Sequence, residues 1–241
     1  MSAALSARGV SVSFGGVQAL VDVDLDVPEG ALVGLIGPNG AGKTTFIDAI
    51  CGFVRARGAV ELDGRDLSGL APHQRARGGL ARTWQAAELF DDLTVGEHVA
   101  VAAHGEAPDA LSLLGLEVAV DKLPAQLSQG ERKLVGVARA LAAAPRVVCL
   151  DEPAAGLDAA ESERLGRQLR EVVDRGTAML LVDHDMSLVL SVCDWIVVLE
   201  FGKVIAVGTP DEVRRDRRVV EAYLGSAGAE RAAETLDIEA Q

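Results

Sequence analysis

The chain has 241 residues, of which 49% are hydrophobic but only 3% aromatic, so its core must be built mainly from aliphatic side chains. Its 23 lysines and arginines against 36 aspartates and glutamates give a formal net charge of −13, which argues against nonspecific binding of nucleic acid, because that requires clustered cations. The sequence contains no stretch of roughly 18 or more apolar residues, and its start lacks the basic-then-apolar pattern of a secretion signal, so we expect neither a membrane span nor a signal peptide.

The N-terminal part predicts antiparallel strands. Residues 21–27 read Val-Asp-Val-Asp-Leu-Asp-Val, a strict alternation of aliphatic and acidic side chains that is typical of a strand with one buried and one solvated face. Val10, Val12 and Phe14 alternate in the same way, and Asp63-Gly64 is a hairpin turn signal. These segments together predict a small antiparallel layer.

Three continuous aliphatic runs differ from these alternating strands. They cover residues 31–36, 147–150 and 178–182. Such runs are expected for parallel strands that are buried on both faces. The runs lead into the loop that begins at Gly37, into Asp151-Glu152 and into Asp183-His184. In open α/β sheets, ligands bind at the carboxyl ends of the strands. The sequence therefore predicts a binding site made of the residues that follow these three runs.

The first run leads into a glycine-rich loop and then into a predicted helix over residues 44–51. Backbone N–H groups of such a loop surround phosphates, and the positive end of the helix dipole favours the same anion. Lys43 would reach the β- and γ-phosphates, the Thr44 hydroxyl would bind Mg²⁺, and Thr45 would lie near the α-phosphate. The sequence thus predicts a nucleotide site whose loop residues are Gly37, Pro38, Asn39, Gly40, Ala41, Gly42, Lys43, Thr44 and Thr45.

Acidic and imidazole side chains follow the other two runs. Asp151, at the end of one run, suits the coordination shell of Mg²⁺, and Glu152 can polarise a water molecule for in-line attack on the γ-phosphate. His184 follows the third run, where a neutral imidazole could donate a hydrogen bond to the γ-phosphate. An isolated histidine is more often structural, so this role depends on the family resemblance described below.

The LSQGE segment, residues 127–131, predicts a helix start. Ser128 is expected to cap an amphipathic helix, with Glu131 three residues later as its capping-box partner. That is a complete structural explanation, although an exposed helix N-terminus with serine and glycine can also bind a phosphate of another molecule. Taken alone, Gln85 is a polar loop residue and Phe14 is a core aromatic, although the Phe14 ring could also stack on adenine.

The order of these segments resembles that of ABC-transporter nucleotide-binding domains, over about residues 5–224. The elements that carry the resemblance are Phe14, GPNGAGKTT, Gln85, LSQGE, VVCLDEP, AAGLD and His184. Further segments are similar to the ATPase subunits of branched-chain amino acid importers. These are FGGVQAL (14–20), RARGGLARTWQ (75–85), DHDMSLVLSVCD (183–194) and the stretch 201–225.

The fold class that we expect is α/β. It consists of a P-loop NTPase core with a mostly parallel sheet, an N-terminal antiparallel β layer, and a helical subdomain inserted at roughly residues 86–142, because residues 88–128 look mainly helical. The last residues, 225–241, are rich in alanine and glutamate and are expected to form a flexible tail outside the domain 5–224.

The resemblance further implies a head-to-tail dimer, of identical or related ATPase subunits, that holds two ATP molecules with Mg²⁺ at its interface. Each site would use the loop 37–45, Gln85, Asp151, Glu152 and His184 from one copy, and Ser128, Gly130 and Asp158 from the other. Lys43, Glu152 and His184 would be catalytic, and Thr44, Gln85 and Asp151 would bind the metal. The dimer would drive two membrane permeases at the cytoplasmic face of the membrane, supplied by an extracytoplasmic solute-binding protein, with no role for nucleic acid.

Several alternatives remain open at this stage. The chain could serve a urea or amide importer, an exporter, a soluble ABC system acting on ribosomes or DNA ends, or a regulatory module. Two departures from the family bear on this choice: Gln129 replaces the usual glycine or aromatic residue, and the stretch between Gln85 and Ser128 is short. That stretch includes the surface expected to touch the permease. The three cysteines, Cys51, Cys149 and Cys193, lack CxxC spacing and are expected to be buried reduced thiols.

Overall fold

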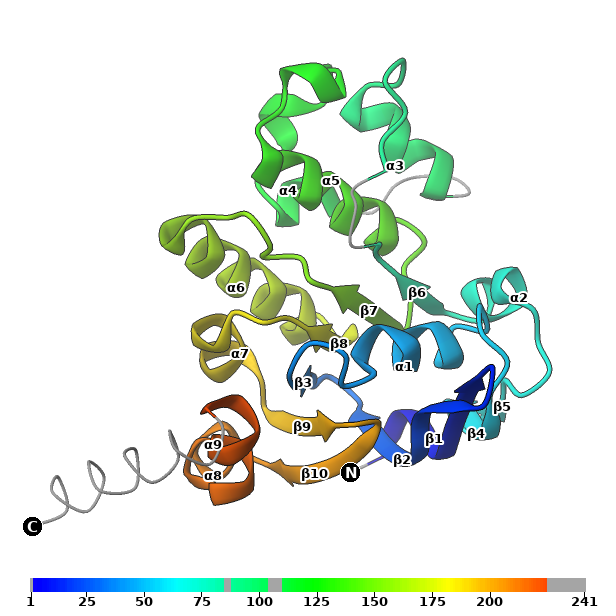
Figure 1. The fold of residues 1–241 in the computed structure, drawn as a ribbon. Helices are drawn as coiled ribbons and strands as arrows, with labels where there is room; N and C mark the ends of the chain where they lie inside the picture. Colours follow the sequence, from blue (N-terminus) through cyan, green and yellow to red (C-terminus); the bar gives the residue numbers. More distant parts are fainter. Residues whose placement is uncertain (1, 85–87, 104–109, 225–241) are drawn as a thin grey trace, which may run out of the picture.

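The structure is a computed structural model that describes residues 2–84, 88–103 and 110–224. Figure 1 shows an antiparallel sheet and a mostly parallel sheet with helices packed around them, and a group of helices that projects from one end of the parallel sheet. This arrangement confirms the expected fold class. No helix among the described residues is long and apolar enough to span a bilayer.

The antiparallel sheet is the predicted N-terminal layer. Its strands are ordered β2-β1-β4-β5. Their bounds are Ala3–Phe14 (β1), Val17–Pro28 (β2), Arg57–Leu62 (β4) and Arg65–Asp66 (β5). The alternation along β2 has the expected effect, since Val23, Leu25 and Val27 are buried while Asp24 and Asp26 between them are exposed.

The second sheet contains the three continuous aliphatic runs. Its strands are ordered β10-β9-β3-β8-β7-β6, and all neighbours are parallel except β10 and β9. Their bounds are Leu32–Ile36 (β3), Leu80–Arg82 (β6), Val147–Asp151 (β7), Ala178–Val182 (β8), Trp195–Glu200 (β9) and Lys203–Gly208 (β10). The three predicted runs are therefore β3, β7 and β8. They lie side by side, and every residue in them is buried.

The parallel sheet separates two hydrophobic cores. Side chains alternate along β3, so Val33 and Leu35 pack with α1 and the antiparallel sheet, while Leu32 and Ile36 pack on the opposite side. The helices outside the projecting group are α1 (Lys43–Ile50), α2 (Pro72–Arg77), α6 (Ala159–Asp174), α7 (Met186–Val192), α8 (Pro210–Arg215) and α9 (Arg217–Leu224). Burial of the strands on both faces explains their continuous aliphatic sequences.

The projecting helices, at the top of Figure 1, form what we call the helical subdomain, comprising the described residues 88–103 and 110–142. It contains α3 (Val95–Ala103), α4 (Ala110–Leu113), short 3₁₀ helices at Glu117–Ala119 and Pro124–Gln126, and α5 (Gln129–Leu141). The expectation that residues 88–128 are mainly helical is confirmed only in part, because the helices there are short and residues 88–94 contain none. The predicted boundaries of this subdomain and of the whole domain remain predictions.

Candidate nucleotide site

The glycine-rich loop joins β3 to α1, the context expected of a phosphate-binding loop. Gly37, Gly40 and Gly42 adopt φ angles of 151°, 80° and 106°, which favour glycine. A Cβ atom at Gly37 would lie only 2.1 Å from the carbonyl oxygen of Leu199 on β9. The loop is therefore held tightly against the sheet, and it leads directly into the N-terminus of α1, whose dipole attracts anions.

Lys43, the first residue of α1, reaches back across the loop. Its Nζ donates hydrogen bonds to the carbonyl oxygens of Gly37, at 2.8 Å, and Pro38, at 3.1 Å. Burial lowers the pKa of the amine, and the nearby carboxylates of Glu152 and Asp151 oppose that shift. The structure thus brings the predicted loop lysine close to the two predicted acidic residues.

Asp151 ends β7 and its side chain is only 1% exposed. Its Oδ2 lies 3.5 Å from Arg82 Nη2, while its Oδ1 is buried and makes no hydrogen bond within the part of the chain that the structure describes. Its backbone N–H donates to the Thr83 hydroxyl at 3.0 Å. Burial raises the pKa of the carboxyl group, and the guanidinium of Arg82 is the main opposing influence.

These atoms provide a test of whether the predicted magnesium ion fits. A buried carboxylate oxygen that has no partner among the described residues needs a cation or a donor, since an unsatisfied buried acceptor is costly. Mg²⁺ prefers oxygen ligands and usually takes one or two carboxylates together with phosphate oxygens. Thr44 is exposed at the adjoining start of α1 and can add its hydroxyl. The residues present therefore fit the ion.

Glu152 has an unusual backbone. Its φ angle is +50°, in the left-handed region, which costs a residue with a side chain about 1–2 kcal/mol. Its N–H donates to the Val182 carbonyl at 2.7 Å, and its own carbonyl accepts a hydrogen bond from Lys133 Nζ at 2.8 Å. Strained backbone of this kind persists where surrounding contacts fix it, and it is common at functional sites.

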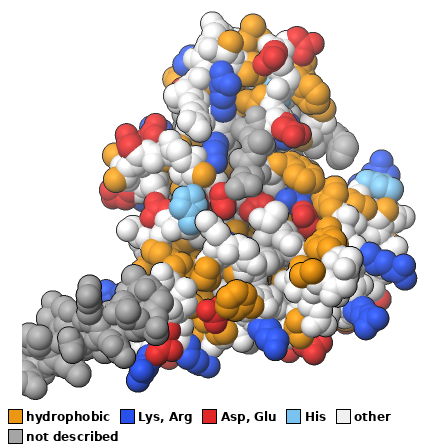
Figure 2. Space-filling model, viewed as in Figure 1, with side chains coloured by type: hydrophobic (Ala, Val, Ile, Leu, Met, Phe, Trp, Pro, Cys, Tyr) orange, Lys and Arg blue, Asp and Glu red, His pale blue; other side chains and the backbone are white. Residues whose placement is uncertain are grey.

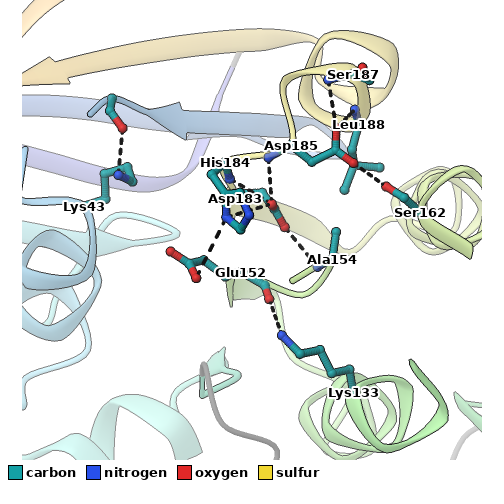
Figure 3. Close-up of polar contacts among 11 residues, drawn as sticks. Lys43, Lys133, Glu152, Ala154, Ser162, Asp183, His184, Asp185, Ser187 and Leu188 are labelled. Carbon is teal, nitrogen blue, oxygen red and sulfur yellow. Dashed lines mark hydrogen bonds and ion pairs between the residues drawn. The ribbon is translucent and has the colours of Figure 1, made fainter. Parts of the chain in front are cut away.

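His184 faces Glu152, as Figure 3 shows. Its Nδ1 lies 4.0 Å from Glu152 Oε2 and 3.7 Å from Asp183 Oδ1, and its side chain is 62% exposed. Asp183 is buried and organises the surrounding backbone, because its carboxylate accepts hydrogen bonds from the N–H groups of His184, Asp185 and Ala154. The structure therefore brings His184 and Glu152 together at the carboxyl ends of β8 and β7.

Ser128 and Asp158 begin two other helices. Ser128 Oγ accepts from the Glu131 N–H at 3.2 Å, and the Ser128 N–H donates to Glu131 Oε2 at 2.7 Å, which confirms the predicted capping box. The same reciprocal bonds join Asp158 to Glu161 at the start of α6. A Cβ atom at Gly130 would lie 2.9 Å from Leu157, so the beginnings of α5 and α6 touch.

Within the described residues, the predicted site residues thus fall into two groups. Lys43, Asp151, Glu152 and His184 form one cluster at the sheet edge, and Ser128, Gly130 and Asp158 lie together at the two helix starts. On the face seen in Figure 2, acidic side chains lie in the band between the helical subdomain and the core below it.

Two further predicted site residues are Gln85 and Phe14. Gln85 lies outside the described residues. Phe14 ends β1 and is 51% exposed, which leaves its ring accessible for stacking. The neighbouring strand β2 passes close to the loop, because a Cβ atom at Gly42 would lie 2.7 Å from the Leu20 side chain.

Three residues at the site are not singled out by any sequence pattern. Arg82 and Thr83 contact Asp151 from the end of β6, a strand too short to show a period. Lys133 reaches Glu152 from α5. Arg82 and Thr83 lie just ahead of Gln85, within the segment RARGGLARTWQ (75–85) that carries the family resemblance, but the resemblance assigns neither residue a role. Nothing in the amphipathic pattern of α5 separates Lys133 from a solvated lysine.

Comparisons with known proteins show which family the chain is similar to. A family model described as ABC transporter matches residues 20–155, and one described as branched-chain amino acid ATP-binding cassette transporter matches residues 203–229. The high-affinity branched-chain amino acid transport ATP-binding protein BraF of Pseudomonas aeruginosa is 34% identical, over 92% of this chain and 98% of its own length. LivG of Salmonella typhimurium, which carries the same description, is 36% identical over the same shares.

Relatives of another kind match as well. The lipopolysaccharide export system ATP-binding protein LptB of Haemophilus influenzae is 36% identical over 92% of this chain and 97% of its own. Among solved structures, a nucleotide-free ATP-binding cassette from an ABC transporter superposes with a TM-score of 0.85, at 28% identity over 92% of this chain and 99% of that one. A cassette in its ADP conformation superposes equally well, at 29% identity over 94% and 100%.

Proposed function

Because the chain belongs to the ABC transporter family and is an ATPase subunit of that family, we propose that it couples ATP binding and hydrolysis to the uptake of branched-chain or related apolar amino acids. The substrate class is supported by the identity to BraF and LivG and by the match of the branched-chain model over residues 203–229. The cluster of Lys43, Asp151, Glu152 and His184 at one sheet edge is the observation that carries the hydrolytic part.

We assign each member of the cluster a role in hydrolysis. Lys43 exchanges its hydrogen bonds to the loop carbonyls for bonds to the β- and γ-phosphates of ATP. Glu152 orients and polarises the attacking water, and His184 donates a hydrogen bond to the γ-phosphate from the adjacent strand end. Asp151 and Thr44, with Gln85, would hold Mg²⁺, which neutralises charge on the phosphates.

We propose that the working unit is a head-to-tail dimer with a second ATPase subunit, identical or related. Ser128, Gly130 and Asp158 lie at the touching starts of α5 and α6, away from the chain's own cluster. Helix N-termini bind phosphate through free N–H groups and the helix dipole. They therefore suit the nucleotide held by the partner, with Phe14 of the nucleotide-binding copy stacking on its adenine.

The permease subunits would bring this ATPase to the cytoplasmic face of the membrane, and an extracytoplasmic solute-binding protein would deliver the amino acid. We assign the permease contact to a hollow of about 770 Å³ between the helical subdomain and the core. Exposed rings of Phe53 and Trp84 and the cations Arg77, Arg139 and Arg146 line it, so it complements a helix with apolar and acidic side chains.

A bulky side chain in this hollow tests the assignment. Ala143 is exposed there, and Ala143→Trp should prevent co-purification with the permeases from native membranes while leaving the ATPase activity of the isolated subunit unchanged. Normal co-purification of this variant would place the permease elsewhere.

An export function is the second candidate, because LptB of Haemophilus influenzae matches this chain as well as the importer subunits do. A urea or amide importer is a further alternative in the same class. Measuring ATPase activity of the assembled transporter with its solute-binding protein separates them. Stimulation by leucine, isoleucine or valine supports the importer, and stimulation by urea, by amides or by no external solute supports an alternative.

The decisive experiment on the site is Glu152→Gln. The variant should bind ATP, hydrolyse it almost not at all, and accumulate as an ATP-bound dimer in size-exclusion chromatography, because the amide cannot polarise the water. Glu163→Gln is a matched control, since Glu163 is an exposed carboxylate of α6 that pairs with Arg167 one turn away. Rapid turnover by Glu152→Gln would remove Glu152 from the catalytic role.

A further inference from the structure

Lys133 connects the two groups of site residues. It lies on α5, little more than one turn beyond the cap Ser128, and its side chain points toward the sheet edge rather than into solvent (Figure 3). Its Nζ donates a hydrogen bond of 2.8 Å to the backbone carbonyl of Glu152. Burial lowers the pKa of this amine, and the carboxylates of Asp183, Glu152 and Asp151 oppose the shift.

The carbonyl that Lys133 contacts belongs to the residue with the left-handed backbone. Three hydrogen bonds hold the peptide groups on either side of the Glu152 Cα atom. The Glu152 N–H donates to the Val182 carbonyl, and the Glu152 carbonyl accepts from Lys133 Nζ at 2.8 Å and, over a longer 3.3 Å, from the Ala155 N–H. The φ angle of +50° determines where the Glu152 side chain leaves the backbone. The lysine contact therefore helps to aim the carboxylate at His184 and the loop.

Helix α5 also contacts the residues that lead from Glu152 to Asp158. Gln129 lies against Gly156, where an added Cβ atom would be 2.8 Å from Gln129 Nε2, and Gly130 lies against Leu157. Helix α5 thus contacts both ends of the segment 152–158. Lys133 contacts Glu152 at one end, and Gln129 and Gly130 contact the residues just before Asp158 at the other. A shift of α5 would therefore disturb contacts at both places.

We propose that Lys133 is a positioning residue that couples the two ATP sites of the dimer, by tying Glu152 of one site to the helix whose N-terminus completes the other. This rests on the proposed dimeric ATPase. When Ser128 and Gly130 engage the partner's nucleotide, α5 is fixed, and Lys133 then holds the Glu152 carbonyl in place. Lys133 would act through the Glu152 backbone, without a contact of its own to either nucleotide.

Three variants of the full-length chain test the proposal. Lys133→Met removes the donor and should lower kcat about 10- to 100-fold, as expected for a misplaced catalytic group, with KM and the Kd for ATP unchanged. Lys133→Arg keeps a donor and a charge and should retain most of the activity. Arg132→Met removes an exposed cation from the same helix and should behave like the wild type.

Measuring the formation of the ATP-bound dimer distinguishes a role of Lys133 in positioning Glu152 from a role in dimer assembly. The double variant Lys133→Met with Glu152→Gln should form the ATP-bound dimer as readily as Glu152→Gln alone, because Lys133 acts on the carboxylate and not on the cap. A Lys133→Met protein that hydrolyses ATP like the wild type, or that loses ATP affinity or melting temperature in step with its activity, would overturn the proposal. A wild-type chain that neither hydrolyses ATP nor dimerises would instead reject the proposed function.

Discussion

The guanidinium of Arg82 lies 3.5 Å from the carboxylate of Asp151, with the two side chains only 7% and 1% exposed. The same guanidinium pairs with Asp48 on α1 and stacks 3.9 Å from the ring centre of Trp84. One cation therefore joins the edge strand β6, the predicted metal ligand on β7, and the helix that follows the phosphate-binding loop. An arginine suits this position because its planar group can pair with carboxylates and stack at once.

Removing this cation should destabilise the protein strongly. Breaking a buried ion pair on one side leaves an uncompensated charge, so Arg82→Met should lower the free energy of unfolding by roughly 3 kcal/mol. Arg146→Met is the control, because Arg146 pairs with Asp63 and Glu29 at the surface, where such pairs are worth less than about 1 kcal/mol. Urea denaturation measures both, and equal losses would contradict the central role of Arg82.

The variant Ser128→Arg should distinguish the helix-capping role of Ser128 from its proposed contact with the partner's ATP. It removes an N-cap, which costs about 1 kcal/mol, and it blocks the helix start that we assign to the partner's ATP. We expect hydrolysis to fall while ATP binding to the monomer stays unchanged. Thr209→Arg is a matched control, since Thr209 caps α8 with Glu212 by the same bonds. It should lose similar stability and keep its activity. Weaker ATP binding by the Ser128→Arg monomer would argue against the head-to-tail arrangement.

The capping-box carboxylates predict how stability depends on pH. The backbone N–H of Ser128 lowers the pKa of Glu131 below its usual value of 4.5. A carboxyl group whose pKa is lowered in the folded state stabilises that state above its unfolded pKa, and the contribution is lost as pH falls through the folded pKa. The melting temperature of Glu131→Gln should therefore lie below that of the wild type at about pH 7, and the difference should disappear as pH falls through the lowered pKa of Glu131, as thermal scans can measure. A pH-independent difference would contradict this linkage.

Two loop glycines should differ in their tolerance of alanine. Gly37→Ala would place Cβ 2.1 Å from the Leu199 carbonyl oxygen, a backbone atom that cannot move aside cheaply, so we expect a loss of at least about 3 kcal/mol. Gly40 also has positive φ, but an added Cβ atom has no neighbour within 4 Å, so Gly40→Ala should cost only about 1–2 kcal/mol. Thermal or urea unfolding tests the order, and equal losses would show that packing against β9 is not the constraint.

Much of this architecture could be predicted from local patterns. The buried runs became β3, β8 and β7 because a strand covered on both faces must be aliphatic throughout, and their polar ends therefore met at one edge. The cap at Ser128 could be predicted because its two hydrogen bonds join residues three apart in the sequence. The hairpin β9–β10 was not predicted, although its strands flank the turn Phe201-Gly202.

The contacts of Arg82 and Lys133 could not be predicted in this way. Arg82 reaches Asp151 across 69 positions and Lys133 reaches Glu152 across 19, so both depend on how separate elements pack. From the sequence alone, a lysine or arginine is expected to be exposed to solvent, since charged residues are rarely buried without a partner. The partner becomes visible only when the sheet order is known.

The three cysteines lie in the interior. Burial raises the pKa of the Cys193 thiol well above its usual range, and a hydrogen bond with Cys51 together with burial raises the pKa of the Cys149 thiol. The thiolate is the form that attacks thiol reagents, so native side chains in such positions react slowly while the fold is intact. A cysteine introduced at an exposed position such as Val118, which is 88% exposed, could therefore carry a fluorescent label without prior removal of the native ones. Labelling of the unmodified chain would in turn report the opening of its core.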